Sequence, residues 1–425
     1  MIVARKVIVL AAALAAFGAI FAVPADAAKR KKTRASAPVA SAVAAVPAAP
    51  AVAALAVTPA ASVAAAPPPL TPLVDGPPTG VTAASLVDQP EAHQFDQRVR
   101  LAFMNALGIG YNVDFIELDA AARALRDGRQ LFPAGDYKLA RFYDASAMPI
   151  EHEHTLPVLD AWIAAMPQSP TPRIVKALVR LQGVIDRLGA AFHGREATQH
   201  VVVDQVALAA IRAGLLADEK ICAGDPHWHY LLARIAMLMR VPEAELSAIV
   251  LRGLAVAPGY QPLIAAGTDY FLPKWSGNAG SLQEWARKSD DALAARGAGF
   301  YAKAYVHAHQ VQFGRAMFEQ SAIDWTRFKA SAAQWLAVVG PSPEALSDLS
   351  ALACLAGDRQ ETARLFAMIK TPYSTKSWSS KDDREACKAW AEKSGVRIWV
   401  EDAVASIGSL RQTVLALLWM LLARG

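Results

Sequence analysis

The segment DPHWHYLLARIAMLMRVPEAELSAIVLRGLAVAPGY, residues 225–260, decides the fold of this chain. Asp225-Pro226 has the pattern of a helix start, a capping side chain followed by proline at the first helical position. Apolar residues then recur at helical spacing until Val241-Pro242 starts a second helix, which Ala257-Pro258-Gly259 ends. The segment therefore predicts two helices of about 13 to 16 residues joined by a short turn.

Similar helical patterns fill the chain on both sides of this hairpin. A hairpin that closes about 33 residues after its start has the repeat length of tetratricopeptide-like arrays. Ser281 to Glu284 has the pattern of a capping box, which marks another helix start. We therefore expect an all-α fold of stacked helical hairpins over residues 94–400, with helices near 115–125, 136–143, 159–166, 171–188, 201–216, 300–313, 324–338, 344–355, 358–369 and 381–393.

The N-terminal part of the chain differs in composition from the rest. Arg5-Lys6 precedes an apolar run and then Ala25-Asp26-Ala27, which is the pattern of an export signal (residues 1–27) cleaved after Ala27. The alternative is an uncleaved inner-membrane anchor, because about 17 apolar residues can just span a bilayer. Residues 28–93 follow as a basic and then Ala/Pro-rich disordered linker. A periplasmic or secreted protein is expected, with the anchored form as the alternative.

Basic residues gather in the same N-terminal part, which changes the meaning of the net charge. The chain has 43 Lys and Arg against 38 Asp and Glu, a formal charge of +5. Seven of the basic residues and one of the acidic residues lie within residues 1–34, which leaves 36 and 37 for the remainder. A nearly neutral body lacks the basic surface that nucleic-acid binding needs, so no nucleic-acid partner is expected.

Short segments between Asp114 and Ile369 share the pattern of a known bacterial family. They are FIELD (115–119), FPAGDYKLARFY (132–143), Trp162 with PQS (167–169), DPHW (225–228), LPKWSG (272–277), YAK (301–303) and ACLAGDR (353–359). Together they resemble the uncharacterised family called domain of unknown function 4034. The resemblance implies a helical, tetratricopeptide-like domain without an established activity, and it transfers no catalytic residue.

Candidate binding residues follow the central hairpin. Lys274 and Trp275 place a cation beside an aromatic ring in a loop, where helical arrays commonly contact ligands. Trp228, in the hairpin itself, is the third candidate. The alternative is that Trp275 fills the junction between two hairpins while Lys274 points to water.

One group of residues has the spacing of a metal site. His193, Glu196 and His200 would share one face if a helix ran unbroken through them. Gly194 interrupts this run, so a polar helix start is the competing interpretation. A metal or Glu/His site of an envelope hydrolase at these three residues is therefore the alternative function, and the sequence does not decide whether the protein is an enzyme.

Other histidine clusters are weaker candidates. Residues 151–154, Glu-His-Glu-His, lie between two prolines and are expected in a solvated loop. The pairs His227/His229 and His307/His309 are two residues apart in expected helices, which directs them to different faces. No cofactor is expected.

The cysteines predict neither a zinc site nor a disulfide scaffold, because Cys222, Cys354 and Cys387 are odd in number and lack CxxC spacing. One pair could still form in an oxidising compartment. The apolar end of the C-terminal segment, residues 401–425, is too short to cross a bilayer, so it either docks as a last helix or lies at an interface. The leading interpretation is a non-catalytic helical scaffold that binds a protein or peptide partner in the cell envelope.

Overall fold

The central hairpin that the sequence predicts is present in the computed structural model. Helix α10 (Pro226–Leu238) and helix α11 (Glu243–Val256) follow each other and pack together. The Asp225 carboxylate caps α10, because its Oδ1 accepts a 2.9 Å hydrogen bond from the backbone N–H of His227. The predicted start and end of both helices are therefore confirmed to within a few residues.

The structure describes residues 79–109, 113–146, 152–192, 204–275, 277–296, 299–370 and 377–393, all within one unit, Pro67–Gly425. Over these ranges the fold is all-α, as predicted, with no strand and a single antiparallel bridge between Leu131 and Tyr137. No helix within the same ranges has the length and apolar character needed to cross a bilayer. The expected signal, most of the linker and the C-terminal segment 401–425 lie outside them.

The helices before the hairpin are α2 (Ala83–Val87), α3 (Ala92–Ile109), α4 (Val113–Asp127), α5 (Lys138–Ser146), α6 (His152–Ala165), α7 (Thr171–Phe192), α8 (Gln205–Ala217) and α9 (Glu219–Cys222). After it come α12 (Gln261–Phe271), α13 (Ala279–Leu293), α14 (Phe300–Ala308), α15 (Met317–Gln320), α16 (Trp325–Val339), α17 (Pro343–Leu355), α18 (Arg359–Met368) and α19 (Lys381–Glu392). Short 3-10 turns (η1, Ala294–Arg296; η3, Gly314–Ala316) and a π turn (η2, His309–Phe313) complete the order.

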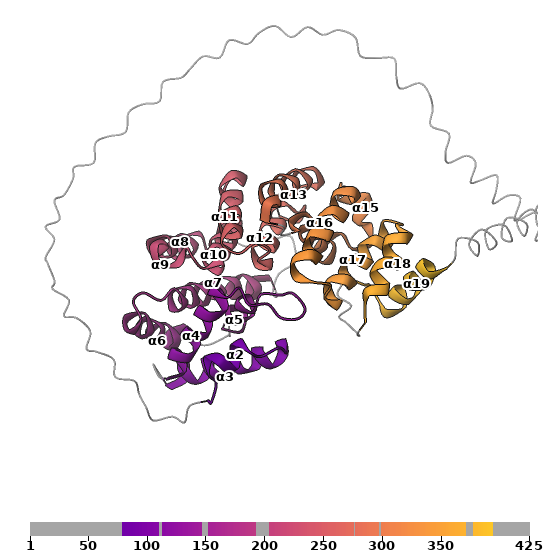
Figure 1. Cartoon of the computed structure of the whole chain (residues 1–425). Coiled ribbons are helices and arrows are strands. Elements are labelled where there is room, and N and C mark those ends of the chain that lie inside the picture. The colour runs from indigo at the N-terminus through magenta and orange to yellow at the C-terminus, as the bar shows by residue number, and fades with distance from the viewer. Residues whose placement is uncertain are drawn as a thin grey trace, which may run out of the picture. The chain divides into compact units, whose positions relative to one another are not determined.

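Neighbours in the chain pack as neighbours in space, which Figure 1 shows as an ordered run of colours from indigo α2 to yellow α19. The pairs α6 with α7, α7 with α8, α10 with α11, and α17 with α18 all pack together, and α14 also packs on α16. Helix α12 contacts α10, α11, α13 and α14. It therefore lies where the earlier helices meet the later ones, and one apolar core extends from Val81 to Leu365.

The folded region begins earlier than the sequence predicts. The linker was expected to continue to residue 93, but α2 lies at residues 83–87 and its Leu86 is fully buried. Thr82 caps α2 in a capping box with Ser85, and the Glu117 carboxylate on α4 accepts a hydrogen bond from Ala83 N. A five-residue helix is too short to show periodicity in the sequence, and its stability depends on its caps and on its packing against α4 and α3.

Two other local predictions are wrong. Ser281 is not the capping residue of α13; Asn278 is, and its side chain accepts from Ser281 N at 3.0 Å while the Ser281 hydroxyl accepts from Asn278 N. The capping box therefore starts three residues before the predicted one. The expected loop at residues 151–154 is also wrong beyond its first residue, because α6 already begins at His152 and contains Pro157.

Candidate functional site

Two adjoining cavities lie beside α12 and together form what we call the α12 groove. The first has a volume of about 210 Å³ and is lined by α12, α14, α16 and α17. The second has a volume of about 410 Å³ and is lined by α5, α10 and α12. Both are lined by Asp136, Gln261 and Ala265, so these three residues join the cavities into one groove.

The sequence of α12 explains why this helix forms the floor of the groove. Leu263, Ile264 and Phe271 are buried in the core. Gln261, Ala265 and Asp269 are spaced four residues apart, so they share the opposite stripe of the helix, and all three line the second cavity. An apolar side thus fixes the helix while a polar stripe faces the groove. The Oε1 atom of Gln261 is buried and has no hydrogen-bond partner among the described residues.

One wall of the groove is the short segment between α4 and α5. Its backbone closes on itself, since Asp136 O accepts from Phe132 N at 2.8 Å and Phe132 O accepts from Gly135 N at 2.8 Å. Gly135 has φ +93°, which L side chains rarely adopt, and a Cβ there would lie 2.3 Å from Val339 Cγ1 on α16. Glycine thus lets the segment pack against α16 and places Asp136 in both cavities.

Lys303 on α14 is the least usual residue of the groove. Only 7% of its surface is exposed, and its ammonium makes no ion pair or hydrogen bond within the described part of the chain. Its Nζ lies 5.3 Å from the centre of the Trp335 ring, which provides a cation–π contact. Burial lowers the pKa of Lys303 to about 8, and the negative charge of Asp136 offsets part of that effect.

The start of helix α14 is held against the second half of α16. Gly299, which precedes α14, has φ +61°, and a Cβ there would lie 2.5 Å from Trp335 Cβ. The Ser331 hydroxyl on α16 accepts a 3.1 Å hydrogen bond from Ala302 N. This close approach brings the Trp335 ring next to Lys303, so the position of the lysine is fixed by packing.

Several other charges of the groove are already paired. The Asp269 carboxylate lies 2.9 Å from His307 Nε2 and 3.6 Å from Arg234 Nη1. Arg141 extends away to Asp96, with 2.6 Å between Nη2 and Oδ2. Glu344 and Asp348 on α17 also have interaction partners.

Two carboxylates of the groove have no ion pair or side-chain hydrogen bond among the described residues. They belong to Asp136 and Asp144, which both line the second cavity. Loss of water around Asp144 raises its pKa to about 6 although the residue keeps an exposed side; Arg141 lowers the pKa, and Asp96 and Asp136 raise it further. Asp136 therefore acts electrostatically on Asp144 on one side and on Lys303 on the other.

Behind the groove, a buried polar network fixes its supporting helices. Asp225 is 1% exposed, and its Oδ2 lies 3.1 Å from Arg126 Nη1 and accepts a 2.8 Å hydrogen bond from the Tyr143 hydroxyl. His227 stacks on Tyr143 and its Nδ1 lies 2.9 Å from the Tyr260 hydroxyl, immediately before α12. Asp225, Tyr143, His227 and Tyr260 are all buried, so these four residues position the helices around the groove.

The structure separates the three predicted binding residues. Trp228 is fully buried, and its indole N–H donates a 2.9 Å hydrogen bond to Leu215 O, so it is a core residue and not a surface contact. Trp275 is 46% exposed and Lys274 is exposed as well. Trp275 therefore does not fill a junction between hairpins, whereas Lys274 is exposed, as that alternative predicts. Neither residue lines the α12 groove.

The predicted metal site, His193, Glu196 and His200, lies outside the described residues and remains a prediction. Elsewhere in the described ranges no three His, Cys, Asp or Glu side chains are arranged to hold a metal ion. The two histidine pairs diverge as expected. In the first pair, His229 Nε2 donates to Ala223 O, whereas His227 contacts Tyr260. In the second pair, His309 contacts Gly314 O and Ser377 O, whereas His307 contacts Asp269.

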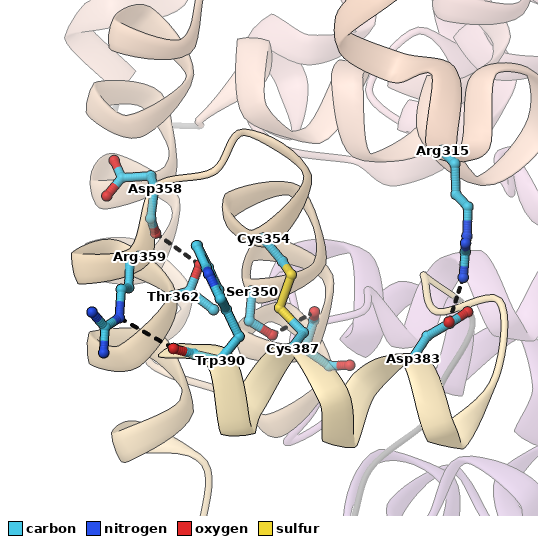
Figure 2. The surroundings of a disulfide bond; sticks show 10 residues. Arg315, Ser350, Cys354, Asp358, Arg359, Thr362, Asp383, Cys387 and Trp390 are labelled. Carbon is cyan, nitrogen blue, oxygen red and sulfur yellow. Dashed lines mark hydrogen bonds and ion pairs between the residues drawn. A yellow bond between two sulfur atoms is a disulfide. The ribbon is translucent and has the colours of Figure 1, made fainter. Parts of the chain in front are cut away.

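Cys354 and Cys387 form a disulfide that the sequence did not single out. It joins the end of α17 to α19, with 6.3 Å between the two Cα atoms, and Figure 2 shows α19 crossing beside α17 and α18. Arg359 adds a second connection, because its Nε donates to Trp390 O at 3.1 Å. Cys222 is free and buried, and burial raises the pKa of its thiol to about 12, so it is a core residue without thiolate character.

Sequence reasoning missed most of the groove. Asp136 and Lys303 lie within two of the segments that carry the family resemblance, but the residues of the groove come from separate helices and share no motif in the sequence. Comparison with known proteins adds nothing to this geometry: no family model, no curated protein and no solved structure matches the chain. The resemblance to domain of unknown function 4034 therefore stays a prediction.

Proposed function

We propose that this protein is an exported helical scaffold whose α12 groove binds a segment of a protein or peptide partner. The observation that carries the proposal is a groove of two joined cavities in which the charged ends of Asp136, Asp144 and Lys303 make no ion pair or hydrogen bond among the described residues, and neither does Gln261 Oε1. The Lys303 ammonium is buried, and buried polar groups are costly unless they are hydrogen-bonded, so a ligand that matches this charge gains affinity.

The chemistry of the groove favours binding over catalysis. The residues that line its two cavities include no Ser, Thr or Cys that could act as a nucleophile. The His307 imidazole is held by Asp269, with 2.9 Å between Nε2 and Oδ1. Such paired charges fix the shape of a groove, whereas the unpaired ones give it specificity.

A tetratricopeptide-like arrangement is part of the proposal. Its support is the succession of packed helix pairs and the 13- and 14-residue helices of the central hairpin. Arrays of stacked helices bind extended segments on one continuous face. The α12 groove would be the equivalent face of this chain.

Export to the cell envelope is also proposed, through the signal at residues 1–27. The Cys354–Cys387 disulfide supports it, because structural disulfides persist in oxidising compartments and are rare in the cytosol. A chain held by an uncleaved anchor would place the same groove in the same compartment. The linker would then allow the groove to bind a partner at a distance from the membrane.

Lys274 and Trp275 would provide a second contact for the same partner. The turn that carries them directly follows α12, and its backbone is fixed by hydrogen bonds from Trp275 N and Gly277 N to Leu272 O. A large aromatic side chain that is 46% exposed on an ordered turn is a common anchor in protein interfaces.

Pull-down from envelope extracts with the purified chain tests the proposal. The wild type should recover a partner, and Ala265→Trp, which fills the groove where its two cavities meet, should lose it. Trp275→Ala should weaken recovery without abolishing it. Lys288→Ala is the matched control, because Lys288 is on α13 and its ion pair with Glu284 is exposed. Partner recovery that is equal for all four proteins, each folded by circular dichroism, would contradict the proposal.

A further inference from the structure

The unmatched charges of the α12 groove have both signs, and their order along the groove limits what can bind there. Asp136 lies between the others, because it lines both cavities. Asp144 lines only the second cavity and Lys303 only the first. The sequence of charges is therefore two carboxylates followed by one buried ammonium.

The buried ammonium needs an acceptor that the described part of the protein does not provide. Only 7% of the Lys303 surface is exposed. The Trp335 ring lies against its ammonium and cannot accept a conventional hydrogen bond from it. An ammonium has three N–H donors and no acceptor. A carboxylate is its strongest partner, since charge-assisted hydrogen bonds are about twice as strong as neutral ones.

A simple anion would nevertheless be a poor ligand. Asp136, Glu344 and Asp348 line the same cavity as Lys303, so the carboxylate of any ligand meets three like charges there and needs a positive charge on the same ligand to offset them. A simple cation would in turn be repelled by Lys303. Arg141 and Arg234 also line the second cavity, but they are paired with Asp96 and Asp269, so a ligand with a carboxylate at one end and a positive charge a short distance away matches the charges that remain.

Resting on the proposed function, we propose that the α12 groove binds the C-terminal end of a polypeptide that has a basic side chain near its last residue. The terminal carboxylate pairs with Lys303, and the basic side chain pairs with Asp136 and Asp144. Gln261 lines both cavities between these charges, and its side-chain amide bonds to the backbone of the bound end once it turns toward the groove.

The sizes of the cavities agree with this ligand. The cavity at Lys303, about 210 Å³, is smaller than the roughly 300 to 1,000 Å³ of drug-sized sites, so it suits a group of about one residue. The adjoining cavity is about 410 Å³ and suits the basic side chain and the residue before it. Because the terminal carboxylate ends the chain, the first cavity needs no exit.

Affinity selection with synthetic peptides tests this inference. Two pools of N-acetylated random pentapeptides, one with free C-terminal carboxylates and one with C-terminal amides, are passed over the immobilised full chain and identified by mass spectrometry. The wild type should retain the free-acid pool at least tenfold better than the amide pool. Within the retained free acids, Lys and Arg should be enriched near the C-terminus.

Two variants assign the charges, and a third serves as control. Lys303→Met should abolish the preference for the free acid, and Asp144→Asn should reduce the enrichment of Lys and Arg. Lys288→Ala should change neither. If Lys303→Met fails to fold by circular dichroism, the acid-against-amide ratio of the wild type and the Asp144→Asn result still decide the inference.

Three results would overturn the inference: equal retention of both pools, retention of amides that carry Asp or Glu in place of a free end, or an acid preference that Lys303→Met leaves intact. With a partner still recovered in the pull-down, such a result would remove the C-terminal ligand and leave the proposed function standing. Failure of both experiments would remove both.

Discussion

The hydroxyl of Tyr143 on α5 donates a 2.8 Å hydrogen bond to Oδ2 of Asp225, the capping residue of α10, although the two residues are 82 positions apart. The same oxygen lies 3.1 Å from Arg126 Nη1 on α4. One carboxylate thus connects three helices and caps one of them. Helices α5 and α10 both line the second cavity, so the shape of the groove depends on this buried contact.

The first prediction concerns the loss of unfolding free energy when the contacts of Asp225 are removed. Asp225→Ala should lower the free energy of unfolding by about 2 to 5 kcal/mol, because it removes a charge-assisted contact and a helix cap and leaves Arg126 only its 3.5 Å ion pair with Asp127. Tyr143→Phe should cost only about 1 kcal/mol, the usual net contribution of one hydrogen bond. Urea unfolding of both variants gives the comparison. Equal costs would mean that the ion pair is not what holds the helices.

A second prediction concerns the wall segment. Gly135→Ala forces a side chain into a backbone with φ +93° and brings its Cβ to 2.3 Å from Val339 Cγ1. We expect a loss of about 1 to 3 kcal/mol in unfolding free energy from strain and overpacking. The double variant Gly135→Ala/Val339→Ala should recover the part that the clash causes. No recovery would assign the whole cost to backbone strain.

The disulfide gives a third prediction. Cys354 and Cys387 are 33 positions apart, and closing a loop of that length constrains the unfolded chain by about 3 to 4 kcal/mol in the entropic model. A reducing agent, or Cys354→Ser with Cys387→Ser, should lower the melting temperature, whereas a reducing agent should not affect the double variant. Thiol titration of the unfolded, unreduced protein should find Cys222 alone. Three reactive thiols would show that the bond is absent.

A fourth prediction follows from His227. Burial lowers its pKa from the ordinary 6.5 to about 3, so the folded protein holds the neutral imidazole. The unfolded chain binds the extra proton below pH 6.5, and stability should therefore fall as the pH drops from about 6.5 toward 3. At 1.36 kcal/mol per unit of pKa, the loss from this residue reaches about 3 kcal/mol by pH 4.

Comparison with His227→Gln isolates that effect. The variant should lose less stability than the wild type over the same pH range in urea unfolding. Burial also raises the pKa of Asp225. Because Asp225 titrates in both proteins, its contribution to the pH dependence largely cancels in the comparison. Parallel pH profiles for the two proteins would show that His227 is not buried in its neutral form.

The fold was predictable from the sequence where local signals agree with tertiary packing. Asp225-Pro226 caps and starts α10, and apolar spacing defines α10 and α11 because the same residues fill the core. Asn278 shows the limit: Ser281 has the sequence pattern of a cap, yet the structure uses the residue three positions earlier. Helix α2 was not predicted, because its five residues carry too little signal and its stability depends on packing against other helices.

The groove could not be predicted in the same way. Asp136 and Lys303 are 167 positions apart with Gln261 between them, and each alone has the pattern of an ordinary polar residue. Only the packing of α14 on α12 and α16 shows that Lys303 is buried without an ion pair among the described residues. Trp228 and Trp275 were both predicted to bind a ligand, but only Trp275 is exposed. Polar neighbours in the sequence do not reveal which tryptophan lies at the surface.

Site-specific photo-cross-linking in intact cells tests most directly whether a partner occupies the groove. A photoreactive amino acid replaces Gln310, an exposed residue that lines the groove, or Lys288, an exposed residue of α13 away from it. We predict a discrete cross-linked partner from position 310 and none from position 288. Adducts of equal intensity from both positions, or from position 288 alone, would contradict binding in the α12 groove.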